Sequence, residues 1–211
     1  MTMPCFQPDE PWQRRIDRRA FLLTLALSAL PVAARARPAH DPVALVRAAR
    51  SQIGVTLRYD SGYARLPYPG GDVPPDRGVC TDVIIRAYRK AYGCDLQRRV
   101  HEDMTQAFNA YPAIWRMRHP DSNIDHRRVP NLQTFFARQN ASLPVSPRGA
   151  DYLPGDLVTQ MLPGNLPHIL IVSDQRRDNG PPLVIHNIGQ GAREEDGLFG
   201  APITGHYRFA P

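Results

Sequence analysis

Lysine is nearly absent from this chain, because Lys90 is the one lysine among its 26 basic residues and the others are arginines. The sequence also lacks a basic cluster with aromatic residues between the charges, which excludes an obvious stacking platform for nucleic acid. It has no internal repeat and no low-complexity tract, which excludes repeat arrays and a disordered chain. No pair of cysteines or histidines has the short spacing of a structural zinc site.

A long hydrophobic run is missing as well. The longest, Phe21 to Leu30, has ten residues, whereas a membrane-spanning helix needs about 20. With 22 prolines and 15 glycines the chain is not a helical bundle, and its 211 residues with 42% apolar content suffice for one core. The composition predicts one loop-rich globular domain.

The first 36 residues have the order of an export leader. The pair Arg18-Arg19 precedes the apolar run, and Ala34-Arg35-Ala36 follows it with the spacing of a cleavage site. The segment Asp17 to Leu22 resembles a twin-arginine signal. We expect cleavage near Ala36, a periplasmic or secreted mature chain over 37–211, and no stable membrane insertion after cleavage. The alternative is a disordered tail with an N-terminal helix.

Cys80 is the candidate reactive group. The stretch Gly78 to Asp82 combines a turn signal with the start of an amphipathic pattern over 80–92, and a helix N-terminus favours the thiolate through its free N–H groups and dipole. The pattern turns the sulfur toward the protein interior. The alternative is that Cys80 is a small buried hydrophobic residue.

A disulfide between Cys80 and Cys94 is not expected. The ends of a helix over 80–92 lie roughly 18 Å apart at 1.5 Å per residue, whereas bridged Cα atoms need about 4.4 to 6.8 Å. Cys94 follows Gly93, which suits the residue after a helix end, so Cys94 is expected to be a packed structural thiol.

The remaining patterns predict helices first and strands afterwards. A helix begins at Asp41-Pro42 and ends near Gly54, residues 56–78 are irregular, and a further helix spans 129–140. Short strands are predicted at 157–161, 168–172, 183–188 and 206–209. The chain is therefore expected to be α+β, with N-terminal helices, including the cysteine helix, packed on an antiparallel sheet.

The section from 97 to 140 is rich in arginine and histidine. It is either a solvated surface or a basic lid that holds an acidic substrate. The formal net charge of +6 favours an acidic polymer such as cell-wall peptide without identifying it.

Two histidines are candidate partners of the thiol. His168 opens an apolar strand and suits a general base, and His186 lies in the next strand, where it would orient His168. Asn187 is the alternative orienting residue, because neighbouring strand residues point to opposite faces. A metal site of Cys80, His168 and His186 is a further alternative, although its ligand spacing is unlike that of structural zinc sites.

The motifs together resemble a known family. A cysteine at a helix start, P-G-D-L-V at 154–158, P-H-I-L-I-V at 167–172 and V-I-H-N at 184–187 resemble the NlpC/p60 branch of papain-like cysteine peptidases. The strings at 71–89 and 123–136 are similar to the YijF-like bacterial family of unknown function numbered 1287. The resemblance covers roughly residues 43 to 210. It departs from the peptidases at Gly78-Val79-Cys80-Thr81, where they commonly show Asp-Cys-Ser-Gly.

The resemblance implies a papain-like NlpC/p60 fold with Cys80 as nucleophile, His168 as general base and His186 as third polar residue. It also implies that Tyr59 binds substrate or stabilises the oxyanion, and that no cofactor or metal is used. Asp82 would contact a substrate amine, or pair with Arg86 at i+4. The expected function is an exported hydrolase of an amide bond in peptidoglycan stem peptides. A silent cell-wall-binding domain, or an amidase or acyltransferase on another substrate, remains the alternative, and the oligomeric state is not predicted.

Overall fold

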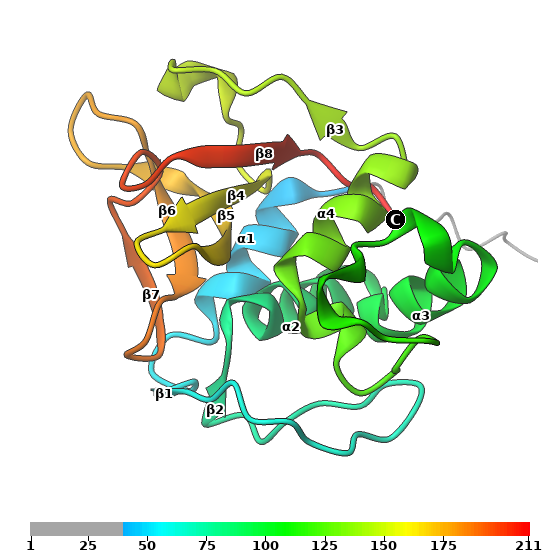
Figure 1. Ribbon diagram of the computed structural model, residues 1–211. Helices are drawn as coiled ribbons and strands as arrows, with labels where there is room; N and C mark the ends of the chain where they lie inside the picture. Colours follow the sequence, from blue (N-terminus) through cyan, green and yellow to red (C-terminus); the bar gives the residue numbers. More distant parts are fainter. Residues whose placement is uncertain (1–39) are drawn as a thin grey trace, which may run out of the picture. The chain divides into compact units, whose positions relative to one another are not determined.

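The structure is a computed structural model that describes residues 40–211 (Figure 1). The predicted export leader over 1–36 lies outside these residues. Within 40–211, no helix is both long enough and apolar enough to cross a membrane.

Among residues 40–211, four α-helices precede the six strands of the main sheet. The first, α1 (Pro42–Arg50), starts as predicted, because the Asp41 side chain accepts a hydrogen bond from the Val43 N–H and proline occupies the first turn. The helix that starts at the candidate cysteine, α2 (Cys80–Tyr92), ends at Gly93, whose φ of 63° suits glycine. Helices α3 (Leu96–Gln106) and α4 (Val129–Arg138) follow, with short 3-10 turns at Phe108–Ala110, Ala113–Trp115, Asp125–Arg127 and Gly149–Asp151.

Six strands form one antiparallel sheet in the order β3-β8-β4-β5-β6-β7. A separate parallel pair joins β1 to β2. The strands are β1 (Arg58–Tyr59), β2 (Arg77–Gly78), β3 (Ser142–Leu143), β4 (Leu157–Leu162), β5 (Leu166–Arg176), β6 (Pro182–Asn187), β7 (Ala192–Glu195) and β8 (Ile203–Tyr207). The α+β class with helices ahead of an antiparallel sheet is therefore confirmed.

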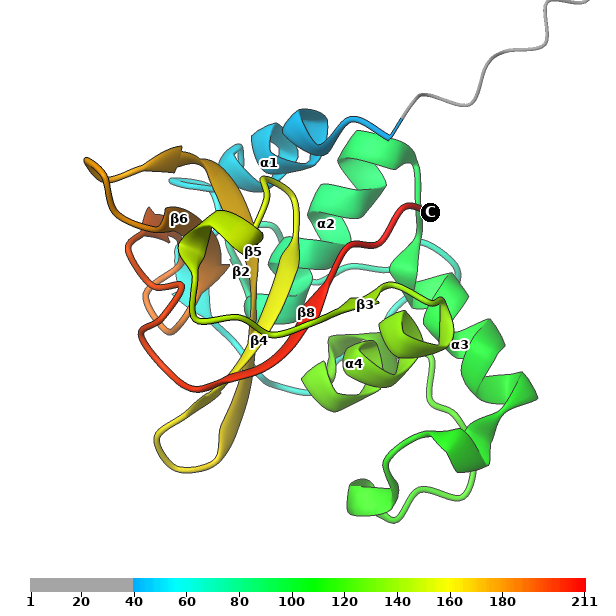
Figure 2. The ribbon, with the colours of Figure 1, turned by 90° about the horizontal axis from the view of Figure 1, so that it is seen from above.

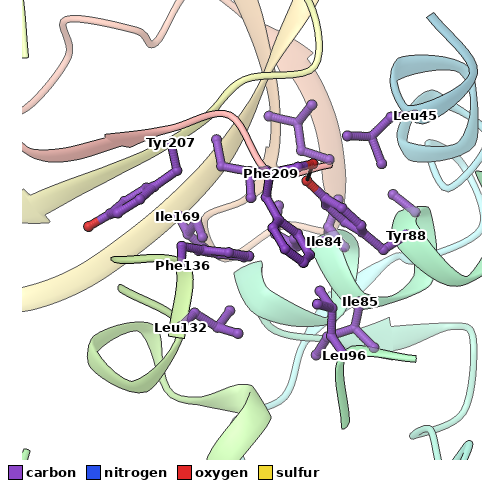
Figure 3. Close-up of a cluster of buried hydrophobic side chains, with 14 of the residues drawn as sticks. Leu45, Ile84, Ile85, Tyr88, Leu96, Leu132, Phe136, Ile169, Tyr207 and Phe209 are labelled. Atoms are coloured by element: carbon purple, nitrogen blue, oxygen red, sulfur yellow. Dashed lines mark hydrogen bonds between the residues drawn. The ribbon is translucent and has the colours of Figure 1, made fainter. Parts of the chain in front are cut away.

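The main hydrophobic core lies between the helices and one face of the sheet. Leu45 of α1, Ile84 of α2 and Ile169 of β5 meet there (Figure 3). Figure 2 shows α1 and α2 side by side along this layer. A second, smaller cluster on the other face includes Leu170 of β5 and Val184 of β6. This alternation along β5 and β6 assigns each candidate site residue to one face of the sheet.

Several sequence-based boundaries differ from the structure. The last strand is β8 at Ile203–Tyr207 rather than 206–209, and β7 was not predicted. The segment 56–78 is not wholly irregular, since it contains β1 and β2. Cys80 and Cys94 are both free and buried, as expected.

Candidate active site

Cys80 is the first residue of α2 and follows directly from β2 and Val79. The Asp82 carboxylate accepts a hydrogen bond of 2.7 Å from the Val79 N–H, which fixes the turn into the helix. Cys80 is only 3% exposed, so its side chain faces the interior as the periodicity predicted.

Tyr59 is brought to the cysteine by backbone pairing. Tyr59 of β1 is in register with Gly78 of β2, two residues before Cys80. Its phenol and the Cys80 thiol border the same cavity, and burial, followed by the nearby Cys80 and Asp82 groups, raises the pKa of Tyr59 to about 12. The phenol therefore stays a proton donor beside the sulfur.

Asp82 forms a buried ion pair with Arg127, a residue of the turn before α4. The Nε and Nη2 atoms of Arg127 each donate a 2.9 Å hydrogen bond to its carboxylate, and the two side chains are 2% and 4% exposed. Arg127 also donates to the carbonyls of Asp60 and Gly62, just after Tyr59. Arg127 thus connects the first turn of α2 to the segment that follows Tyr59.

The alternative pairing of Asp82 with Arg86 is wrong. Asp82 is buried, and Arg127 compensates its charge. Its expected partner Arg86 instead contacts Asp72 at 2.8 Å. Because both Asp82 oxygens already accept hydrogen bonds, the geometry supports a positioning role more than contact with a substrate amine.

The two candidate histidines form one hydrogen-bonded chain with Glu195 of β7. Nε2 of His168 lies 2.8 Å from Nδ1 of His186, and Nε2 of His186 lies 2.8 Å from a carboxylate oxygen of Glu195. The chain crosses β5, β6 and β7 on one face of the sheet. His186 is thus placed beside His168 as an orienting residue would be.

The cysteine reaches the same point of β5. Cys80 and Ile169 share the main core, and the Ile169 N–H is one of the groups that stabilise a negative charge on the sulfur. Ile169 directly follows His168. The pairing of β5 with β6 ends at Ile171 and Ile185, so the two strands are no longer paired where Cys80 and His168 lie.

Asn187 has a different role from the one considered. Its side-chain amide donates a 2.9 Å hydrogen bond to the carbonyl of Gly78 and a longer one to Arg58. It leaves β6 on the face that Ile185 also uses, toward the helices, whereas His186 leaves on the other face. Asn187 therefore holds the chain before Cys80, and His186 contacts His168.

Burial favours the neutral forms of Cys80, His168 and His186. Burial raises the pKa of Cys80 to about 11, and the N–H groups of Ile169, Thr81 and Cys80 itself only partly oppose it. Burial, with a smaller contribution from His186, lowers the pKa of His168 to about 3. The pKa of His186 is also lowered, by burial more than Glu195 raises it. The helix N-terminus lowers the pKa of the thiol, as expected, but desolvation raises it by a larger amount, so the thiolate is not favoured.

A cavity of about 340 Å³ opens onto Cys80 and Tyr59. Part of its wall is the section 97–140, where the Arg128 guanidinium lies 4.2 Å from the centre of the Trp115 ring. That section is neither a simple solvated surface nor a uniformly basic lid, because Arg127 is buried in an ion pair. The other lining residues are Ser61, Val79, Ile114, Ile124, Arg127, Val129, Pro130, Asn165 and Pro167.

The sequence analysis did not identify three residues of the candidate site. Glu195 lies in a polar strand with no apolar alternation, Trp115 lies in an irregular segment, and Arg127 looked like a surface charge. The one available signal was the string at 123–136, which includes Arg127. Within residues 40–211, no cluster of three or more His, Cys, Asp or Glu side chains has an arrangement suited to a metal ion.

Comparison with known proteins identifies the family. The family model described as "Domain of unknown function (DUF1287)" matches residues 46–209. The Escherichia coli (strain K12) protein named "Uncharacterized protein YijF" is 54% identical over 171 residues, which is 81% of this chain and 83% of that protein. The structure of NlpC2 from Trichomonas vaginalis aligns at 14% identity and a TM-score of 0.37 over 82% of this chain. The chain spans only 50% of that structure. By the extent of the family match and the identity to YijF, the chain belongs to the DUF1287 family.

Proposed function

We propose that this chain is a cysteine hydrolase of the papain-like NlpC/p60 type that cleaves an amide bond. The proposal is carried by a buried thiol, Cys80, at the start of α2 and by the Tyr59 phenol on the same cavity. The hydrogen-bonded His168–His186 pair begins one residue before Ile169, whose N–H stabilises a negative charge on the sulfur. A thiol with a neighbouring oriented imidazole is the arrangement that nucleophilic catalysis requires.

The reaction starts from the neutral thiol and neutral imidazole. Substrate entry places the carbonyl carbon against Cys80, whose S–H proton passes to Nδ1 of His168 as the carbon–sulfur bond forms. The Cys80 N–H and the Tyr59 hydroxyl stabilise the oxyanion. His168 then gives its proton to the leaving nitrogen, the C–N bond breaks, and water attacks the thioester with His168 as base. These steps restore the thiol and release a carboxylic acid.

We propose peptidoglycan stem peptides as the substrate. The support is the resemblance of the motifs around Cys80, His168 and His186 to NlpC/p60 peptidases, together with a net charge of +4 over residues 37–211 that suits an acidic polymer. The cavity of about 340 Å³ has room for a short peptide segment rather than a folded protein.

The decisive experiment digests purified peptidoglycan and identifies the fragments by mass. The wild-type chain is expected to release new fragments with a free carboxyl and a free amine, and Cys80→Ala is expected to release none. Cys94→Ala is the matched control, because Cys94 is the other buried free thiol among residues 40–211. Identical product profiles for wild type and Cys80→Ala would reject the hydrolase.

A silent cell-wall-binding domain is the second candidate, and one observation favours it. The buried Cys80, with its pKa raised to about 11, is a poor nucleophile without help from a base. Alkylation by iodoacetamide at pH 7, localised by mass spectrometry, separates the two. A hydrolase predicts that His168→Ala slows alkylation of Cys80 at least about tenfold without changing that of Cys94. Equal rates at Cys80 would favour the silent domain.

We also propose export of the chain to the periplasm or medium through its first 36 residues. The support is the order of basic pair, apolar run and small-residue cleavage motif. Fusing residues 1–36 to a reporter that functions only outside the cytoplasm is expected to give signal, and replacing Arg18 and Arg19 by lysine is expected to abolish it. Signal that survives the double replacement would point to another export route.

A further inference from the structure

Glu195 occupies the outer end of the histidine chain. In the β6–β7 pairing Glu195 lies opposite Val184, and His186 lies opposite Arg193, so Glu195 is the diagonal neighbour of His186 on the same face. Its neighbour Glu194 leaves β7 on the other face and binds Arg50 of α1 at 2.7 Å. Two consecutive glutamates therefore have separate partners.

The hydrogen-bond chain has one consistent set of proton positions. An ionised carboxylate only accepts, so Nε2 of His186 must carry the proton donated to Glu195. Neutral His186 then has a bare Nδ1, which accepts from Nε2–H of His168. Neutral His168 is in turn left with a bare Nδ1. That nitrogen is the one that makes no hydrogen bond to His186.

We propose that Glu195 is a positioning residue that fixes the tautomers of both imidazoles, so that His168 keeps the unprotonated Nδ1 that a general base needs. This inference rests on the proposed function for its catalytic consequence, while the tautomers themselves are a property of the resting protein. Without Glu195, His186 is free to hold its proton on either nitrogen. If the proton of His186 were on Nδ1, that group would donate to Nε2 of His168. The proton of neutral His168 would then be on Nδ1, and this nitrogen could not accept the thiol proton.

Few other charges face this chain. His186 faces His168 from β5, and Arg193 and Glu195 from β7. Arg193 is directed to Gln190, and Glu195 also borders an open groove with Arg176, Arg177 and Asp196. The Glu195 side chain is 41% exposed, so the pair with His186 contributes little to stability. Its effect should therefore appear in proton position before it appears in unfolding.

The test reads the tautomers directly by nitrogen-15 NMR of labelled histidine in the full chain. In the wild type, His168 and His186 are both expected as the Nε2–H form. In Glu195→Ala, the His186 nitrogen shifts are expected to move toward a mixture of both forms, and Glu195→Gln, whose amide can donate or accept, should fall between. Asp196→Asn is the matched control, because it removes the adjacent, exposed charge. Unchanged Nε2–H tautomers in Glu195→Ala and Glu195→Gln would overturn the proposal.

The kinetic arm separates this inference from the proposed function. On the fragment-releasing substrate, Glu195→Ala is expected to lower kcat at least tenfold with little change in KM, and Glu195→Gln to lower it less. Wild-type kcat in both variants would overturn the catalytic consequence. If the wild-type chain releases no fragments, the proposed function is rejected. The NMR result would still decide whether Glu195 fixes the tautomers.

Discussion

At the residue scale, the properties of each candidate group depend on neighbours that are distant in sequence. The N–H groups at the helix N-terminus lower the pKa of the Cys80 thiol, but burial against β5 raises it by a larger amount. Burial also lowers the pKa of His168, which keeps its imidazole neutral. A nucleophile built in this way needs proton transfer to His168 at the moment of attack, because neither group is charged beforehand.

Replacing Tyr59 by phenylalanine tests the hydroxyl beside the sulfur. The ring keeps its packing in the cavity wall, but the proton donor for the oxyanion is lost. We expect kcat/KM on the released-fragment assay to fall by about 100-fold, in the range for one oxyanion donor. Tyr63→Phe is the control, since the exposed Tyr63 bonds Asp121 at 3.1 Å and does not line the cavity. Equal rates for both variants would remove Tyr59 from the proposed mechanism.

Replacing Asp82 by asparagine tests the buried ion pair. The change leaves the Arg127 charge buried without a counter-ion, and we expect the free energy of unfolding to fall by about 3–5 kcal/mol. Urea unfolding measures it. Glu102→Gln is the control, because Glu102 and Arg98 are each 55% exposed and 3.9 Å apart, and its loss should cost under about 0.5 kcal/mol. Similar losses for both variants would contradict a structural role for the Asp82–Arg127 pair.

At the element scale, the entry into α2 is held from several sides. The β1–β2 pairing brings Tyr59 to Gly78, Asn187 of β6 binds the Gly78 carbonyl, and Asp82 caps the Val79 N–H. These contacts come from three separate parts of the chain. The orientation of Cys80 is therefore a property of the assembled domain and not of the helix alone.

Gly78→Ala tests how tightly this entry is built. A Cβ atom on Gly78 would lie 2.8 Å from the Asp82 carboxylate, which Arg127 prevents from moving aside. We expect a loss of about 1–3 kcal/mol in the free energy of unfolding, as for overpacking, and a loss of fragment release. Gly200→Ala is the matched control, because its Cβ would meet nothing closer than 3.4 Å. Wild-type stability of Gly78→Ala would show that the entry can shift.

The sequence predicted the elements better than the contacts between them. The cap at Asp41, the start of α2 and the apolar strand after His168 follow from local periodicity and turn residues, and the structure has all three. The strand β7 is too polar to show an apolar pattern, so Glu195 was missed. The Asp82–Arg127 pair joins residues 45 positions apart, and helical spacing alone suggested Arg86 instead.

At the scale of the whole molecule, the domain buries several histidines in neutral form. Burial lowers the pKa of His126 to about 3, as it does for His168, and it also lowers that of His186. In an unfolded chain a histidine has a pKa near 6.5. Between these values the unfolded chain binds more protons than the folded one, so the free energy of unfolding falls as the pH decreases from about 6.5 toward 3.

His126→Gln isolates one part of this acid sensitivity away from the cysteine. Unfolding of the wild type takes up one proton at this site. Between pH 6 and pH 4, the free energy of unfolding should therefore change less steeply with pH in the variant, by up to about 1.4 kcal/mol per pH unit. Urea unfolding at several pH values measures the slope, which does not depend on any constant loss caused by the substitution. His119→Gln is the control, because His119 is exposed and should leave the slope unchanged. If the His126→Gln slope matched that of the wild type, His126 would have to be protonated in the folded domain, and the acid sensitivity would have to come from other groups.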